Sequence, residues 1–421
     1  MSEIKENFFE NNALFKFKTY SCDMTIDTIH TTPGAEPICE YKFIANTDKP
    51  ITLAYAPKKG LVRIDEKGSI IENDILGTFI ALCDKSEKDL TKFVNENGFL
   101  FPINNDAFEG IKKEDLTNII TRLRHTVELM SEISSTKKNY YKIVSCIINL
   151  LFFEPVEIKT NQMNESYRTH HYQYVDLLKA TGGELSAKRK QQEFEIGILT
   201  IENDTILPNY QIKIEDYNNE ISDNKGIYKN ILQVYVNTEF EENEKRKLTD
   251  VLFHSLEKCK SLDNFFSNDK ILDDISDEFK NAIIEVANYI IGEEINGNLN
   301  RIRPLYNSKK MTPSWVIGDL LSALYFSIFY LKPNLELYRQ CANPRCNKYF
   351  LVSATSNKKI YCSPECCSRV TQYTYRKKKK NEENAKKTVW INHTVFMFLI
   401  LELPLYLRQH QYIRQWLLSP S

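Results

Sequence analysis

Five of the ten cysteines in this chain lie between residues 341 and 367, in an order typical of metal ligands. The first pair, Cys341 and Cys346, brackets Ala-Asn-Pro-Arg, and fifteen residues later Cys362-Ser-Pro-Glu-Cys366-Cys367 supplies the second. Structural zinc binds four tetrahedral ligands, and two close pairs separated by a loop place two thiolates on each of two turns. The window therefore predicts one structural zinc ion, because four thiolates leave no open position for a substrate.

The second pair coincides with a predicted helix start. Ser363 suits the cap of a helix, and Pro364 suits its first position. A thiolate in the first turn is favoured by the helix dipole, so we favour Cys366 over its neighbour Cys367 as the fourth ligand. A disulfide, a redox or iron–sulfur role and chance clustering are the alternatives. The predicted ligands are Cys341, Cys346, Cys362 and Cys366, with Cys367 as the alternative fourth.

The segment that follows is strongly basic. Residues 341–387 contain twelve Lys and Arg and three Asp and Glu, a balance of +9 in a chain whose net charge is −1. On a helix, Arg and Gln can contact base edges, whereas Lys and Tyr can contact phosphates. A solvated helix end is the simpler alternative, but a zinc-fixed start favours nucleic-acid binding. The predicted contacts are Arg369, Gln372, Tyr373, Arg376, Lys377, Lys378, Lys379 and Lys380.

The run from Cys341 to Lys380 resembles the bacterial CGNR-type zinc finger, found at the C-terminus of proteins described as stress-induced transcription regulators with an ABATE N-terminal domain. The matching pieces are Cys-Ala-Asn-Pro-Arg-Cys, Tyr349-Phe350-Leu351 and Tyr361-Cys362-Ser363. The tetrapeptide that names the finger is Cys366-Cys367-Ser368-Arg369 here and keeps only the Cys and Arg. The resemblance implies a zinc-containing DNA-binding protein that regulates transcription. The alternative is a zinc-stapled module that binds RNA or an acidic protein.

The chain as a whole is predicted to be an α+β protein with four regions. Residues 1–72 form a β-rich N-terminal region, because Leu14 to Thr19 alternates in polarity and short apolar runs follow it. Residues 73–335 form a mainly helical body with a few strands, among them Ile231 to Val236. Residues 336–387 hold a zinc-ribbon or treble-clef-like module and its basic helix. Residues 388–421 are an apolar tail that docks on the body or on a second subunit, with a membrane-surface anchor as the alternative.

Several helices are predicted from capping signals and from apolar residues at helical spacing. Ser86 and Asp89 form a capping box at the start of a helix that Gly98 ends. Apolar stripes predict helices over Asp115 to Ile133 and Tyr140 to Phe153. Further helices are predicted over Glu241 to Lys260 and from the cap Ser276 to Ile291.

The segment before the cysteines is predicted to be helical as well. Thr312-Pro313 is a good cap and first-turn pair for an apolar helix that runs to about Leu331. A short helix from Leu335 to Arg339 then leads to the first cysteine. Within the cysteine module, Pro344 favours the turn of the first pair. Lys348 to Leu351 is predicted to be a strand that pairs with Lys359 to Tyr361.

The remaining residues suggest no catalytic set. His125 lies in an amphipathic helix and is predicted to be a polar-face or packing residue, and His170-His171 to be part of a polar loop. Cys83 and Cys146 lie in apolar helical runs and are predicted core residues. The N-terminus has no secretory signal and no segment is long enough to span a bilayer, so we expect a cytoplasmic protein with reduced thiols and no enzymatic activity. A homodimer is left open.

Overall fold

The structure is a computed structural model, and it divides the chain into two compact units. The first unit comprises residues 1–340 and 347–360, and the second comprises residues 341–346 and 361–421. The four-region division predicted from the sequence stays a prediction. The structure describes residues 13–29, 37–72, 74–103, 110–152, 156–160, 163, 166–169, 231, 234, 240–259, 261–308, 311–333, 335–356 and 359–383.

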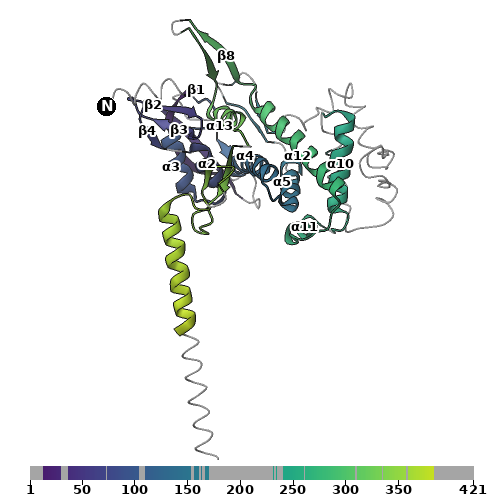
Figure 1. Ribbon diagram of the computed structural model, residues 1–421. Coiled ribbons are helices and arrows are strands. Elements are labelled where there is room, and N and C mark those ends of the chain that lie inside the picture. Colours follow the sequence, from purple (N-terminus) through teal and green to yellow (C-terminus); the bar gives the residue numbers. More distant parts are fainter. Residues whose placement is uncertain are drawn as a thin grey trace, which may run out of the picture. The chain divides into compact units, whose positions relative to one another are not determined.

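An antiparallel sheet forms the N-terminal part of the first unit, as the sequence predicts (Figure 1). Its strand order is β1-β2-β3-β4, and β5 pairs with β2. Alternation places Phe15 and Phe17 in the core, and Phe15 stacks on Tyr55, its partner across the β1–β2 ladder. The strands are β1 (Phe15–Ile29), β2 (Ile38–Ala56), β3 (Gly60–Ile64), β4 (Ile70–Glu72) and β5 (Ile111–Lys112).

Helices make up most of the remaining described residues of the first unit, which confirms the predicted α+β class. The capping box of Ser86 and Asp89 is present, and Gly98 ends that helix with a φ of 87°, a left-handed value that favours glycine. Ser276 accepts a hydrogen bond from the Phe279 amide and caps its helix, as predicted. The helices are α2 (Ile75–Ile80), the 3-10 turn η1 (Ala81–Asp84), α3 (Glu87–Asn97), α4 (Lys113–Ser134), α5 (Tyr140–Phe152), α10 (Glu242–Leu256), α11 (Leu262–Ser267), α12 (Asp277–Asn298) and α13 (Leu320–Phe329).

A buried ion pair lies where α4, α5, α12 and α13 pack together. The side chains of Arg122 on α4 and Glu294 on α12 are 2% and 0% exposed and form two hydrogen bonds, one of them 3.1 Å long from Nε to Oε2. Arg122 also donates to the Leu150 carbonyl of α5, and the Tyr325 hydroxyl of α13 donates to Glu294. These charges therefore join four helices through one buried polar cluster.

A hairpin of β10 (Glu336–Gln340) and β11 (Tyr349–Ser353) belongs to the first unit, although its two strands flank the first cysteine pair in sequence. It packs on α2 and α4. A Cβ atom on Gly77 of α2 would lie 2.5 Å from the Tyr349 carbonyl oxygen, so this close approach requires glycine. The Tyr349 hydroxyl hydrogen-bonds Glu128 of α4. The hairpin is thus positioned by close packing of its backbone against α2 and by a buried hydrogen bond to α4.

Three predictions about strands and helices are wrong in the segment before and within the module. Residues Thr312–Ile317 form strand β9, which pairs with β8 (Ile302–Asn307), and the helix starts only at Leu320, capped by Asp319. Residues 336–340 form β10 in place of the predicted short helix, and β10 takes the place of Lys359 to Tyr361 as the partner of β11. Ribbon β8–β9 has only two strands, so prolines are tolerated there.

Some of the remaining predictions fall on residues that the structure does not describe. Ile231 and Val234 are helical, which contradicts the predicted strand at these two positions. His170, His171 and the tail at 388–421 lie outside the described residues. Short strands β6 (Glu157–Ile158) and β7 (Tyr167–Arg168) pair with each other. Of the helices in the described ranges, none combines the length and apolar character needed to cross a bilayer.

Candidate zinc site and the helix that follows it

Four cysteine sulfurs converge within the second unit. The Sγ atom of Cys362 lies 3.6 Å from that of Cys346 and 3.5 Å from that of Cys366, and its amide donates to the Cys341 sulfur at 3.5 Å. Tetrahedral zinc with Zn–S bonds of about 2.3 Å would separate its sulfurs by about 3.8 Å. All four thiols are free, so no disulfide competes for them. The spacing of the sulfurs fits one zinc ion with four cysteine ligands.

A tight turn shaped by Asn343 positions the first pair. Its side chain is buried and accepts the Arg345 amide at 3.1 Å, and its carbonyl accepts the Cys346 amide at 2.9 Å. Sequence reasoning assigned this turn to Pro344 and overlooked Asn343. Asn in such a turn folds its side chain onto the backbone two residues ahead, and that preference is the signal that could have identified it.

The second pair lies at a helix start, as the sequence predicts. Residues 364–383 are helical, and the Ser363 hydroxyl accepts the Cys366 amide at 3.3 Å. Cys366 is therefore fixed in the first turn and is buried, whereas Cys367 is exposed and lies outside the sulfur cluster. The fourth ligand is Cys366, and the alternative assignment to Cys367 is wrong.

Because the four thiols lie close together, the pKa values of Cys362 and Cys366 change in opposite directions. Burial raises the pKa of Cys366, but hydrogen bonds with Asn343 and the other three cysteines outweigh burial and lower it to about 7. The pKa of Cys362 is raised, by burial and then by hydrogen bonds with the other cysteines. Without a cation, such a cluster keeps protons on some of its sulfurs. A divalent ion removes this conflict because thiols that bind it lose their protons.

Residues 338–379 match the family model of the CGNR zinc finger. This match confirms the resemblance drawn from the sequence, and the region it covers contains all four clustered cysteines. Cys341, Cys346, Cys362 and Cys366 form the zinc-binding site of this finger. Comparison of the chain with curated proteins gives no match, and neither does comparison with solved structures.

Every residue predicted to contact nucleic acid lies on the helix at 364–383, and each is exposed. With 3.6 residues per turn, one side of this helix carries the basic residues Arg369, Arg376 and Lys380 with Tyr373 between them. The guanidinium of Arg345, from the turn of the first pair, lies 5.6 Å from the centre of the Tyr373 ring, a cation–π contact. Sequence reasoning overlooked Arg345, which adds a positive charge to this side.

Proposed function

We propose that the helix at 364–383 binds DNA and that the protein regulates transcription. One observation carries this proposal: Cys366 anchors the first turn of an exposed helix whose following turns carry Arg369, Arg376 and Lys377 to Lys380. Exposed Arg and Lys on a helix can neutralise phosphates, and Arg and Gln can hydrogen-bond base edges in the major groove. Match to the CGNR finger supports a recognition role but leaves the partner open.

We also infer that zinc in this finger has a structural role and that the finger has no enzymatic activity. Four thiolates fill the coordination shell of a tetrahedral ion, which leaves no position for a substrate or a water molecule. The ion is then needed to hold the turn around Asn343 and the first helical turn together.

The test is binding of the purified protein to random-sequence duplex DNA at several salt concentrations. The logarithm of the binding constant should fall linearly with the logarithm of the salt concentration, by about 0.9 per phosphate contacted. Replacement of a contacting cation in Arg376→Gln should weaken binding and reduce the slope by about 0.9. Lys88→Gln changes an exposed lysine on α3 of the first unit, and should leave both quantities unchanged.

Absence of DNA binding at low salt would overturn the proposal. Retention of RNA without retention of DNA would replace it by RNA recognition. Binding to neither, together with salt-sensitive capture of an acidic protein, would favour the protein-interaction alternative. Selection of bound fragments from a random library would then report sequence preference.

A further inference from the structure

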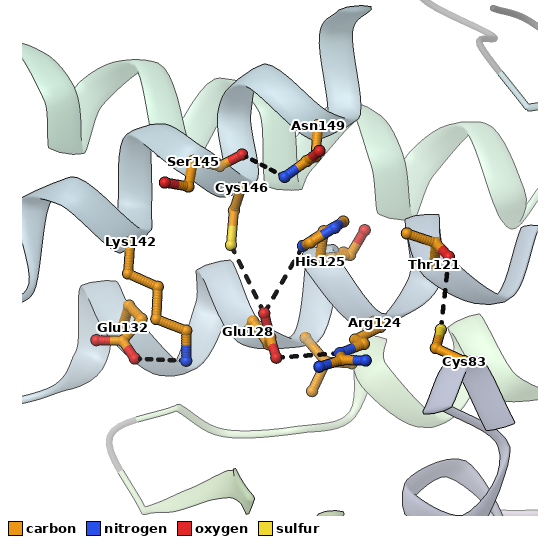
Figure 2. A network of polar contacts seen from close by, with 12 residues as sticks. Cys83, Thr121, Arg124, His125, Glu128, Glu132, Lys142, Ser145, Cys146 and Asn149 are labelled. Atoms are coloured by element: carbon orange, nitrogen blue, oxygen red, sulfur yellow. Dashed lines mark hydrogen bonds and ion pairs between the residues drawn. The ribbon is translucent and has the colours of Figure 1, made fainter. Parts of the chain in front are cut away.

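A second convergence of metal-binding side chains lies in the first unit, between α4 and α5. His125 and Glu128 are one helical turn apart on α4, and Cys146 faces them from α5 (Figure 2). The Glu128 Oε2 atom lies 3.7 Å from His125 Nδ1 and 3.9 Å from Cys146 Sγ. Imidazole, carboxylate and thiolate are the three ligand types that zinc takes from proteins. These residues lie outside the segment that matches the CGNR finger.

The spacing of these atoms is close to that of a zinc coordination shell. With Zn–O and Zn–N bonds of about 2.1 Å and a Zn–S bond of about 2.3 Å, a tetrahedral ion separates O from N by about 3.4 Å and O from S by about 3.6 Å. The observed separations are each about 0.3 Å longer than these values, a difference that small side-chain rotations can close. In the cysteine finger, the sulfur–sulfur distances of 3.6 and 3.5 Å differ from the tetrahedral value of about 3.8 Å by a similar amount.

An unsatisfied polar atom points into this space. His125 Nδ1 is shielded from solvent and has no hydrogen-bond partner, since 3.7 Å to Glu128 is too long for one. Shielded polar atoms in folded proteins are nearly always paired, so an unpaired one requires an explanation. A bound cation would satisfy this nitrogen together with the Cys146 sulfur, whose contact with Glu128 is also long.

Two cationic side chains, Arg124 and Lys142, lie nearby and would repel a metal ion if their charges were not neutralised. Each has a carboxylate of its own: Arg124 pairs with Asp84 at 2.8 Å, and Lys142 pairs with Glu132 at 3.0 Å. The contact of Arg124 with Glu128 is to the other carboxylate oxygen, Oε1, at 3.3 Å. Oε2 therefore remains available to an ion.

The two carboxylate oxygens of Glu128 thus have different surroundings. Tyr349 of β11 donates its hydroxyl proton to Oε1, on the same side as Arg124. Hydrogen bonds of this kind orient ligands in metal sites.

We propose that His125, Glu128 and Cys146 bind a second zinc ion. Cys146 would release its thiol proton to water on binding, and the fourth coordination position would hold a water molecule. The His125 side chain is 17% exposed, which gives the ion a path from solvent. This ion would connect α4 to α5 independently of the cysteine finger.

Metal content of the tag-free full-length chain tests this proposal. Native mass spectrometry after dialysis against zinc-containing and then zinc-free buffer should show two zinc ions per chain. The variants Cys146→Ala and His125→Asn should each show one. Cys22→Ala removes another buried cysteine, from β1, and should keep both ions. One ion in the wild-type chain, or two in Cys146→Ala, would overturn the proposal.

A second measurement does not depend on the folding of a variant. Cobalt(II) added to the metal-free wild-type chain should saturate at two equivalents, with thiolate-to-cobalt absorption in both phases. One phase should be about a quarter as intense as the other, because it involves one cobalt–thiolate bond where the finger has four. Saturation at one equivalent would contradict the second site and leave the finger and its proposed DNA binding untouched.

Discussion

At the scale of single residues, adjacent side chains of the same type differ in role because the backbone directs them differently. Cys366 and Cys367 are neighbours, yet one is buried among sulfurs and the other is exposed. Cysteine spacing together with the helix-start signal of Ser363 was enough to predict the four ligands, because a cap at Ser363 places Cys366 in the first helical turn. The turn of the first pair was predicted from Pro344, but the role of Asn343 in it was overlooked, although the local turn preference of Asn indicates it.

His125, Glu128 and Cys146 could not be grouped from sequence either. His125 and Glu128 show the spacing of one helical turn, which is common on amphipathic helices. Cys146 reaches them only because α4 and α5 pack in one particular register. The prediction of His125 as a packing residue and of Cys146 as a core residue follows from local pattern alone, whereas the cluster is a property of tertiary structure.

Asp74 makes the stability of the chain depend on pH. Its carboxyl caps α2, and burial raises its pKa to about 6, although a hydrogen bond from the Gly77 amide opposes the change. The folded state therefore keeps a proton on Asp74 between the ordinary pKa of 3.8 and about 6. Raising the pH through this window lowers the free energy of unfolding, because the folded state binds more protons than the unfolded state.

The variant Asp74→Asn has no titrating group at this position, so its free energy of unfolding should depend on pH differently from that of the wild type. The free energy of unfolding of the variant, relative to the wild type, should increase from pH 4 to pH 7 by up to about 3 kcal/mol. Urea unfolding at each pH measures it. Asp277→Asn at the start of α12 serves as the control: hydrogen bonding to Lys280 lowers the Asp277 pKa, so its titration lies below this window. A pH-independent difference for Asp74→Asn would contradict the assignment.

At the scale of helices and strands, the buried pair of Arg122 and Glu294 should matter more than any exposed pair. Glu294→Leu leaves the guanidinium buried without its partner and should cost about 3–5 kcal/mol of unfolding free energy. Glu285→Leu removes an exposed pair with Lys247 from the same helix and should cost less than about 1 kcal/mol. Urea denaturation of both variants measures the difference, and equal costs would show that the buried pair does not hold α4 to α12.

Long helices were predictable because their apolar stripes extend over several turns, as in α4 and α5. Strand β10 was mistaken for a helix because five residues are too few to separate the two periodicities. Strand β10 pairs with β11 on the other side of the first cysteine pair in sequence, so no local sequence signal indicates this pairing. The Thr312-Pro313 signal was also misleading, because Asp319 is the residue that caps α13.

At the scale of the whole molecule, the division into two units predicts a local response when zinc is lost from the finger. Cys362→Ser removes a ligand of the finger only. Hydrogen exchange should increase in residues 361–383, whereas the amides of α4 and α12 in the first unit should keep their protection. Mass spectrometry of peptides resolves this pattern. Uniform loss of protection throughout the chain would contradict two separately stable units.

The path of the chain through the hairpin has a consequence for transplanting the finger into another protein. A graft cut at the first cysteine would carry β11 without β10, and would leave behind the α2 surface on which Gly77 admits the Tyr349 backbone. An exchangeable cassette must therefore begin before Glu336, and its recipient needs a matching glycine-bearing surface. A gene fusion that moves the finger must likewise carry β10 and a surface like that of α2. We therefore expect the finger and the surface beneath its hairpin to be inherited as one segment.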